Sequence, residues 1–319
     1  MVLSEFEIIR RFFHRGAISR QDVALGIGDD GAVVRVADGY DLIISTDMLI
    51  SGVHFPADAE PNDIGFRALA VNLSDLAAMG AEPAWATLVL SLPEASEPWL
   101  SAFARGFFSL ADAASVQLIG GDIARGPLTI TVSVYGSVPR GRALLRSGAR
   151  PGDRIFVTGT LGDAAAALET DLKTAPATHT RVLRQRLLHP MPRFIVGIGL
   201  RGVASSAIDI SDGLASDLGH IAEASGVGAR VEVASLPLSE PLRRLLMRQR
   251  AWELALSGGD DYELCFTAPA RHEALVASLA HSSDCTITQI GVIESELGLR
   301  WRMPDGSLLA IARPGYRHF

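Results

Sequence analysis

Apolar residues recur at helical spacing in one segment of the N-terminal half, the run Ala68–Ala78 together with the Met79 that follows it. The apolar positions are three or four residues apart: Leu69, Leu73, Leu76 and Met79. This spacing predicts a largely buried helix, yet Asn72, Ser74 and Asp75 lie inside it. A buried carboxylate is costly unless it is hydrogen-bonded, paired or bound to a cation. Because the nearest basic residue is Arg67, Asp75 either accepts backbone hydrogen bonds or binds a cation.

The other patterns of this half predict an α+β domain. Ser4 and Glu7 have the spacing of a capping box, which predicts an amphipathic helix at the start. The apolar run Asp41–Ile50 predicts a buried strand, although three polar residues stand in its middle. Further strands are expected at 83–92, 116–123 and 128–138, and a second helix at 98–114. This order favours a sheet with its helices on one face.

Strand and helix patterns alternate in the C-terminal half. Arg154–Leu168 predicts a strand, a glycine-containing loop and a helix, but it lacks the Gly-Lys-Ser/Thr ending of a P-loop. At Ala207–Leu214 a strand enters a helix, where Ser211 or Asp212 can serve as N-cap and exposed amide groups can meet phosphate. We expect the polar stretch Glu169–Thr180 to be a loop.

The boundary between two domains is expected in Pro139–Asp153, which is rich in Arg, Gly and Ser and contains Arg146. We therefore assign residues 1–140 to an N-terminal domain and residues 150–319 to a C-terminal domain. The chain has 319 residues, of which 48% are hydrophobic, so each domain has enough apolar residues for its own core.

Seven aspartates share a local setting beside Gly, Ser or Thr at a predicted strand edge or helix start: Asp29, Asp30, Asp47, Asp75, Asp122, Asp209 and Asp212. Two carboxylates ~5 Å apart repel by roughly 3 kcal/mol at an effective dielectric of 20, so a converging set requires cations. These phrases contain no His or Cys, which argues against zinc. Oxygen ligands alone favour Mg²⁺, which usually bridges carboxylates to substrate phosphates. The set therefore predicts a nucleoside triphosphate and phosphoryl transfer.

Composition excludes several classes of protein. The net charge of −7 argues against a nucleic-acid binder, which needs a basic face. Cys265 and Cys285 match no metal spacing and fit a reduced, cytoplasmic setting. The start, Met1–Phe13, lacks the features of a signal peptide. No apolar run approaches the ~20 residues that span a bilayer, so we expect a soluble protein without membrane partners.

Six phrases of the chain, taken in this order, resemble those of the thiamine-monophosphate kinases: Gly26–Ala32, Ser45–Met48, Ala70–Ala81, Gly120–Asp122, Asp209–Leu214 and Ser257–Leu264. That family is part of the group of ATP-binding proteins that includes aminoimidazole ribonucleotide synthetase and selenophosphate synthetase. The resemblance implies an α+β N-terminal domain of the aminoimidazole ribonucleotide synthetase type, which binds ATP and Mg²⁺ and dimerises through its sheet. It also implies an α/β C-terminal domain that completes the active site.

The resemblance implies the following site residues by position. Those matching the magnesium ligands are Asp30, Ser45, Thr46, Asp47, Asp75, Asp122, Asp209 and Asp212. Those matching ATP contacts are Gly121, Asp122, Arg146 and Ser211, and those matching contacts to thiamine monophosphate are His54, Glu263 and Phe319. No residue is assigned as a general base. The implied reaction is in-line transfer of the γ-phosphate of ATP to thiamine monophosphate.

Two alternatives belong to the same group of enzymes. Selenophosphate synthetase would require a Cys or selenocysteine in the N-terminal glycine-rich segment, which has none. The hallmark segments of aminoimidazole ribonucleotide synthetase match the Ser-Thr-Asp and Asn-Leu-Ser-Asp phrases less well. A catalytically silent nucleotide-binding module is a third alternative, and the intact aspartates at every matched position argue against it.

Overall fold

The computed structural model describes residues 4–15, 20–169 and 176–316. The chain divides into two compact units: Met1–Leu76 with Ala81–Gly141, and Ala77–Gly80 with Arg142–Phe319. Among the helices of the described ranges, none combines the length and apolar character needed to cross a membrane.

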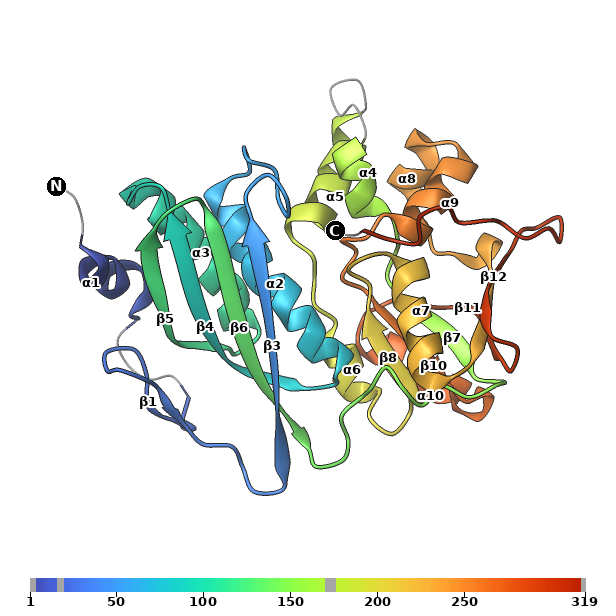
Figure 1. Ribbon diagram of the computed structural model, residues 1–319, viewed down its shortest axis with the longest axis horizontal. Helices are drawn as coiled ribbons and strands as arrows, with labels where there is room; N and C mark the ends of the chain where they lie inside the picture. The colour runs from blue at the N-terminus through green and yellow to red at the C-terminus, as the bar shows by residue number, and fades with distance from the viewer. Residues whose placement is uncertain (1–3, 16–19, 170–175, 317–319) are drawn as a thin grey trace. The chain divides into compact units, whose positions relative to one another are not determined.

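The first unit is built on a four-stranded sheet with the order β3-β6-β4-β5. The strands are β3 (Tyr40–Ile50), β4 (Glu82–Leu92), β5 (Gln117–Arg125) and β6 (Thr129–Pro139). β6 pairs antiparallel with β3 and β4, and β4 pairs parallel with β5. Two helices, α2 (Pro61–Ala78) and α3 (Glu97–Ala113), lie against one face of this sheet (Figure 1). This arrangement confirms the predicted α+β class.

Short elements precede the sheet. The predicted capping box is present, because the Ser4 side chain accepts from the Glu7 amide and the Glu7 side chain accepts from Ser4. It opens α1 (Glu5–Ile8), which continues as a π-helical turn, η1 (Ile9–Phe13). A small hairpin pairs β1 (Val23–Leu25) with β2 (Val33–Val34).

The structure confirms α2 as a buried helix and corrects two predictions about strands. Leu69, Leu73 and Leu76 are fully buried. The prediction that β3 is a buried strand was wrong: its side chains alternate, and Ile44 (58%) and Met48 (52%) are exposed. The reason is that the helices cover only one face of the sheet. β5 was expected to end at residue 123 but continues to Arg125, because it stays paired with β4.

The second unit has a six-stranded sheet with the order β12-β9-β11-β7-β10-β8. Its strands are β7 (Arg154–Thr158), β8 (Ser206–Asp209), β9 (Gly228–Glu232), β10 (Leu264–Ala268), β11 (Ile287–Glu294) and β12 (Gly298–Arg302). All neighbours pair antiparallel except β9 and β12. Its helices are α4 (Asp163–Glu169), α5 (Ala177–Leu188), α6 (Phe194–Gly199), α7 (Leu214–Ser225), α8 (Glu240–Leu245), α9 (Arg248–Ser257) and α10 (Glu273–Ser282), with short turns η2 (Val233–Ser235) and η3 (Ala270–His272).

Helices cover both faces of this second sheet (Figure 1). Successive side chains of β7 point to opposite faces of the sheet. Ile155 and Val157 pack with α7 and α9 on one face, whereas Phe156 packs with α6 and α10 on the other. Burial on both faces explains why every residue of β10 is buried, without alternation. Alternating helices and strands in this layered form confirm the predicted α/β class.

Two local predictions in this unit were wrong. The stretch expected to be a loop is partly helical, because α4 ends at Glu169 and α5 begins at Ala177. The N-cap of α7 is Gly213, which has no side chain to form a cap. The Asp217 carboxylate instead accepts from the amides of Asp212 and Gly213 at 3.2 and 3.1 Å. The spacing of residues in the sequence did not predict that a side chain of α7 itself would cap the N-terminus of this helix.

The contact between α2 and α3 generates a stability prediction. A Cβ on Gly106 would lie 1.8 Å from the Asn62 carbonyl oxygen, so the two helix backbones approach too closely for any side chain there. We expect Gly106→Ala to lower the free energy of unfolding by about 1–3 kcal/mol, measured by urea denaturation. Gly219→Ala is the control, because its Cβ would be 3.8 Å from Leu299. That helical site should gain about 0.5–1 kcal/mol. Equal stability of Gly106→Ala and the parent would contradict this packing.

Candidate functional site

Three of the predicted ligands of the first unit meet between β3 and α2. Side chains alternate along β3, and Ser45 and Asp47 lie on the side that faces the helix. The Ser45 hydroxyl donates to the Asp75 carboxylate at 2.5 Å. Asn72 fixes the approach of helix and strand, because its side-chain oxygen accepts from the Asp47 amide at 2.8 Å and its amide group donates to the Ala68 carbonyl at 2.9 Å.

The two carboxylates of this group disfavour each other. Burial, together with the charge of Asp75, raises the pKa of Asp47 to about 6. A hydroxyl and two carboxylates are the ligand type that a hard divalent cation takes, so these residues fit Mg²⁺. Across the described ranges, no three His, Cys, Asp or Glu side chains are close enough to hold a metal ion by themselves. A cation here would therefore need further oxygen ligands, from water, the backbone or a bound substrate.

Thr46 and Asp122 lie on the opposite face of the same sheet. The Thr46 hydroxyl donates to Ser133 at 2.8 Å. Ser133 is the cross-strand partner of Thr87, and Thr87 pairs with Gly120. Met48 pairs across the strands with Thr131, Thr131 with Val89, and Val89 with Asp122. Cross-strand partners point to the same side of a sheet, so Asp122 lies on the same face as Met48 and Thr46. The predicted ligands of this unit are thus divided between two faces.

A cavity of about 560 Å³ brings together the glycine-rich loop and the Gly-Gly-Asp phrase. Its polar wall contains Asp29, Asp30, Gly121 and Asp122. The apolar part of the wall includes Phe6, Ile9, Phe13, Ile27, Leu118 and Ile119. A cavity with one acidic wall and one apolar wall suits a molecule that has a flat base and a metal-bound phosphate chain.

The predicted ligands of the second unit follow β8. Asp209 is the last residue of the strand, and Ser211 and Asp212 lie between it and α7. The amides of Asp212 and Gly213 are already hydrogen-bonded to Asp217. Burial and the charge of Asp212 raise the pKa of Asp217 to about 7, whereas the positive charge of Arg146 opposes this rise. The structure therefore brings Arg146, a predicted ATP contact, close to this group.

Two residues that sequence reasoning did not assign lie beside Asp212. The Asp260 amide donates to the Ser211 carbonyl at 2.8 Å, and the Tyr316 amide donates to the Asp212 carbonyl at 3.1 Å. A sequence signal for Asp260 exists, because Gly258-Gly259-Asp260 repeats the phrase Gly120–Asp122. Tyr316 gave only the weak signal of a ring near the chain end. The predicted contact Phe319 lies outside the described residues.

The loop that contains Asp260 has a strained backbone. Asp260 and Tyr262 have φ values of 61° and 49°. Residues other than glycine cost about 1–3 kcal/mol each in that region, and such strain persists only where surrounding contacts hold it. Loops of this kind are common at functional sites.

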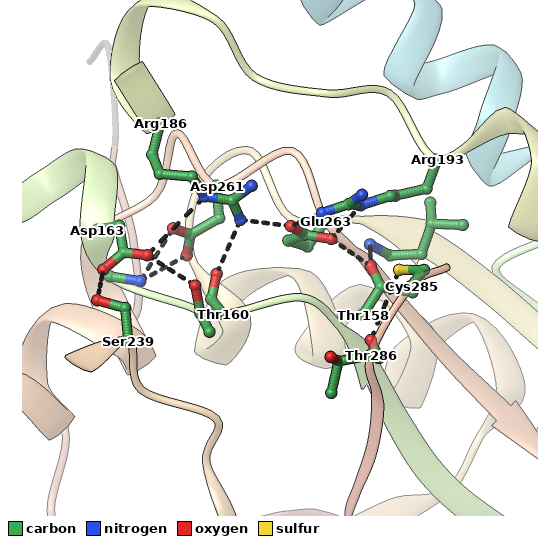
Figure 2. A network of polar contacts seen from close by, with 12 residues as sticks. Thr158, Thr160, Asp163, Arg186, Arg193, Ser239, Asp261, Glu263, Cys285 and Thr286 are labelled. Carbon is green, nitrogen blue, oxygen red and sulfur yellow. Dashed lines mark hydrogen bonds and ion pairs between the residues drawn. The ribbon is translucent and has the colours of Figure 1, made fainter. Parts of the chain in front are cut away.

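Glu263, a predicted contact to thiamine monophosphate, lies directly after this loop in a buried network (Figure 2). Its side chain is 1% exposed. Arg193 donates to both carboxylate oxygens at 2.7 and 2.6 Å, Arg186 donates to one of them, and Thr158 donates to the other at 2.5 Å. Burial alone would raise the pKa of Glu263, but the bonds and charges of the two arginines outweigh it and hold the pKa below its usual value.

His54, the other predicted contact to thiamine monophosphate, lies in the turn after β3. Its Nδ1 accepts from the Ile50 amide at 2.9 Å, and its carbonyl accepts from Arg67 at 3.1 Å. These bonds fix the orientation of the ring relative to the end of the strand.

Comparison with known proteins agrees with this arrangement. Residues 28–138 match the family described as AIR synthase related protein, N-terminal domain, and residues 150–302 match AIR synthase related protein, C-terminal domain. The thiamine-monophosphate kinase of Salmonella typhimurium strain LT2 is 49% identical over 323 residues, which cover 100% of this chain and 99% of that protein.

Solved structures agree as well. The crystal structure of thiamine-monophosphate kinase from Stenotrophomonas maltophilia K279a has a TM-score of 0.85 and 51% identity, covering 91% of this chain and 93% of that chain. The structure of AaThiL complexed with AMPPCP and TMP has a TM-score of 0.78 and 34% identity, covering 92% of both chains.

Fold and site together define a two-domain protein of the AIR synthase-related class. Within that class, the chain belongs to the thiamine-monophosphate kinase family.

The raised pKa of Asp47 predicts how stability depends on pH without metal. Its pKa is about 6 in the folded chain against an ordinary value of 3.8, so the ionised side chain destabilises the fold. The penalty is complete above pH 6 and disappears as the pH falls below about 4. In EDTA, Asp47→Asn should be more stable than the parent at pH 7.5 by up to about 3 kcal/mol and equally stable at pH 4.

Thermal unfolding across this pH range measures the effect. Asp41→Asn is the control, because Asp41 lies on the same strand but is exposed beside Arg140. An Asp47→Asn variant that is less stable than the parent at pH 7.5 would show that the ionised Asp47 carboxylate does not destabilise the fold.

Proposed function

We propose that this chain transfers the γ-phosphate of ATP to thiamine monophosphate, forming thiamine diphosphate and ADP. The observation that carries the proposal is the group of Asp47, Asp75 and Ser45, which places two carboxylates and a hydroxyl together, with the pKa of Asp47 raised to about 6 by burial and by the charge of Asp75. The family supports it, and the related AaThiL was solved complexed with AMPPCP and TMP.

Mg²⁺ is proposed as the cation at these carboxylates. The proposed ligands are Asp30, Ser45, Thr46, Asp47, Asp75 and Asp122 in the first unit and Asp209 and Asp212 in the second. Because the side chains of the first unit are divided between two faces of its sheet, they would hold more than one ion. When bound, Mg²⁺ neutralises negative charge on the phosphate oxygens.

The chain's own residues would bind and orient the two substrates. Gly121, Asp122, Arg146 and Ser211 are proposed to contact ATP, with the guanidinium of Arg146 as a donor to phosphate oxygens. His54, Glu263 and Phe319 are proposed to contact thiamine monophosphate. The attacking group is a phosphate oxygen that is already an anion, so no general base is needed. Catalysis then comes mainly from alignment and from compensation of charge.

An assay of product formation tests this proposal. The protein is incubated with ATP, thiamine monophosphate and Mg²⁺, and thiamine diphosphate and ADP are quantified by chromatography. We expect equal amounts of the two products. Asp75→Asn should fold normally and lower turnover by at least about 100-fold, because an amide oxygen is a poorer ligand for the cation that stabilises the transferring phosphate.

Two results would contradict the proposal. Normal turnover by Asp75→Asn would show that the carboxylate group is not part of the site. ADP release without thiamine diphosphate would instead indicate another activity of the AIR synthase-related class, or a nucleotide-binding module.

A homodimer is proposed to form through the sheet of the first unit. Leu42, Ile44 and Met48 are exposed on β3, which is an edge strand. An apolar face on an edge strand is a site for association, and a second copy of the chain carries the same apolar face. A cytoplasmic location stays a prediction from the composition.

Sedimentation velocity at micromolar concentration tests the dimer. We expect the parent to sediment as a dimer and Ile44→Glu as a monomer, because the new charge would be buried without a partner. Leu275→Glu is the control, since Leu275 is similarly exposed but lies on α10 of the second unit. A monomeric parent, or equal sedimentation of the parent and Ile44→Glu, would exclude this interface.

A further inference from the structure

The hairpin of β1 and β2 carries the glycine-rich loop but has little backbone pairing of its own. Its strands are three and two residues long and pair at only two positions. A hairpin this small is marginally stable at best in water, so its place in the fold depends on what it packs against. The loop 26–32 joins the two strands and contains Asp29 and Asp30. Whatever holds the hairpin therefore also sets the position of these two carboxylates.

The hairpin packs on the face of the first sheet that α2 and α3 do not cover. Trp85 precedes Thr87 by two residues on β4, so its side chain points to the face that also carries Asp122. Trp85 is nevertheless only 2% exposed, because Val23 and Val34 of the hairpin belong to the apolar cluster around it. This packing brings the glycine-rich loop to the same face as Asp122.

Three polar contacts fasten the start of the hairpin to β4, through Arg20, Asp22 and Trp85, which we call the latch. Arg20 donates to both oxygens of the Asp22 carboxylate, at 3.0 and 2.6 Å. Nε1 of Trp85 donates to the same carboxylate at 3.1 Å, and the Arg20 guanidinium lies 5.9 Å from the centre of the Trp85 ring. The bond from Arg20 contributes most to the lowered pKa of Asp22; burial opposes it, and the bond from Trp85 lowers the pKa further. The carboxylate is therefore held as an anion between the hairpin and the sheet.

The same arginine ties the hairpin to the strand that carries Asp122. Nη1 of Arg20 donates to the Ser115 carbonyl at 2.9 Å, and the Arg20 amide donates to the Gln117 side chain at 3.1 Å. Gln117 is the first residue of β5, and Asp122 follows on that strand. The latch thus joins the two acidic segments of the 560 Å³ cavity, which are the loop 26–32 and the part of β5 around Asp122.

The latch residues stand behind the cavity wall. The cavity is lined by Asp30 and Asp122 but by none of Arg20, Asp22 and Trp85, all three of which the structure describes. The side chains of Arg20 and Asp22 are 27% and 30% exposed, and an ion pair with that exposure adds little to stability by itself. Any effect of the latch on a ligand must pass through the loop that it holds.

We propose that the three latch residues position the glycine-rich loop against β5, so that Asp30 and Asp122 face one metal–nucleotide. The inference rests on the proposed kinase function and extends it to residues that do not touch either substrate. Their role is distinct from that of the metal ligands, because they act on the ligand only through Asp30.

Calorimetric titration with Mg-AMPPCP tests the proposal without depending on turnover. Asp22→Asn removes the charge that Arg20 binds, whereas Trp85→Phe removes only the indole donor and keeps a ring in the apolar cluster. Asp22→Asn should raise the Kd for Mg-AMPPCP by about 10- to 100-fold, the range found when the partners of metal ligands are removed. Trp85→Phe should raise it by about 3- to 10-fold, because one bond to Asp22 is lost.

Steady-state kinetics should show the same selectivity. The KM for ATP should rise with the Kd, whereas the KM for thiamine monophosphate should change by less than about 3-fold. Asp41→Asn is the matched control, because its ion pair with Arg140 is exposed and lies in the same unit, and its constants should equal those of the parent. Thermal unfolding without ligand shows whether each variant is folded at the assay temperature. If Asp22→Asn is not folded there, Trp85→Phe carries the same test.

A double-mutant cycle shows whether the latch acts through Asp30. Asp30→Asn alone should weaken the binding of Mg-AMPPCP. Adding Asp22→Asn should then weaken it by less than about 2-fold more, because the side chain that the latch positions is already gone. Effects of the two substitutions that multiply would overturn the proposal.

The remaining outcomes separate the two proposals. An unchanged Kd for Mg-AMPPCP in folded Asp22→Asn and Trp85→Phe would overturn the positioning role, as would equal rises in the KM of both substrates. A parent that binds Mg-AMPPCP but never forms thiamine diphosphate would disprove the proposed function, while the titrations of the variants would still decide the role of the latch. A parent that does not bind Mg-AMPPCP would overturn both.

Discussion

Burial of the Asp47 carboxylate beside the charge of Asp75 is the constraint on which the candidate site of the first unit depends. Strand β3 and helix α2 bring both carboxylates into the same half-buried space, and Asn72 locks the strand to the helix beside them. The Ser45 hydroxyl donates to the Asp75 carboxylate there. Arrangements that lower stability are found at functional sites. A divalent cation, together with substrate oxygens, would remove the repulsion between the two carboxylates.

The second unit handles its buried charge in the opposite way. Glu263 is paired with Arg186 and Arg193. Breaking such a pair leaves an uncompensated buried charge, which makes the cluster a fixed point in the fold. The contrast is therefore between Asp47, whose pKa is raised by burial and by the charge of Asp75, and Glu263, whose pKa is held down by the bonds and charges of two arginines.

Local pattern was enough to predict much of the fold. Helical spacing predicted α2, and the capping box predicted α1. Exposure of β3 could not be predicted, because it depends on which face of the sheet the helices cover. The four bonds to Glu263 come from residues that are distant in sequence. The cap by Asp217 depends on the backbone conformation of the segment before α7. Neither feature could be predicted from local pattern. A motif match gives the identity of a residue but not whether its side chain faces a ligand.

Binding of Mn²⁺, followed by electron paramagnetic resonance, tests most directly whether the carboxylates bind a divalent cation whose coordination is completed by a nucleotide. The protein is titrated with Mn²⁺ alone and with AMPPCP present. We expect Mn²⁺ to bind weakly to the protein alone and more tightly when AMPPCP is present. With AMPPCP present, replacing Asp47 by Asn should weaken Mn²⁺ binding by at least about 10-fold. Equal Mn²⁺ affinity in the parent and in Asp47→Asn, with AMPPCP present, would contradict the account.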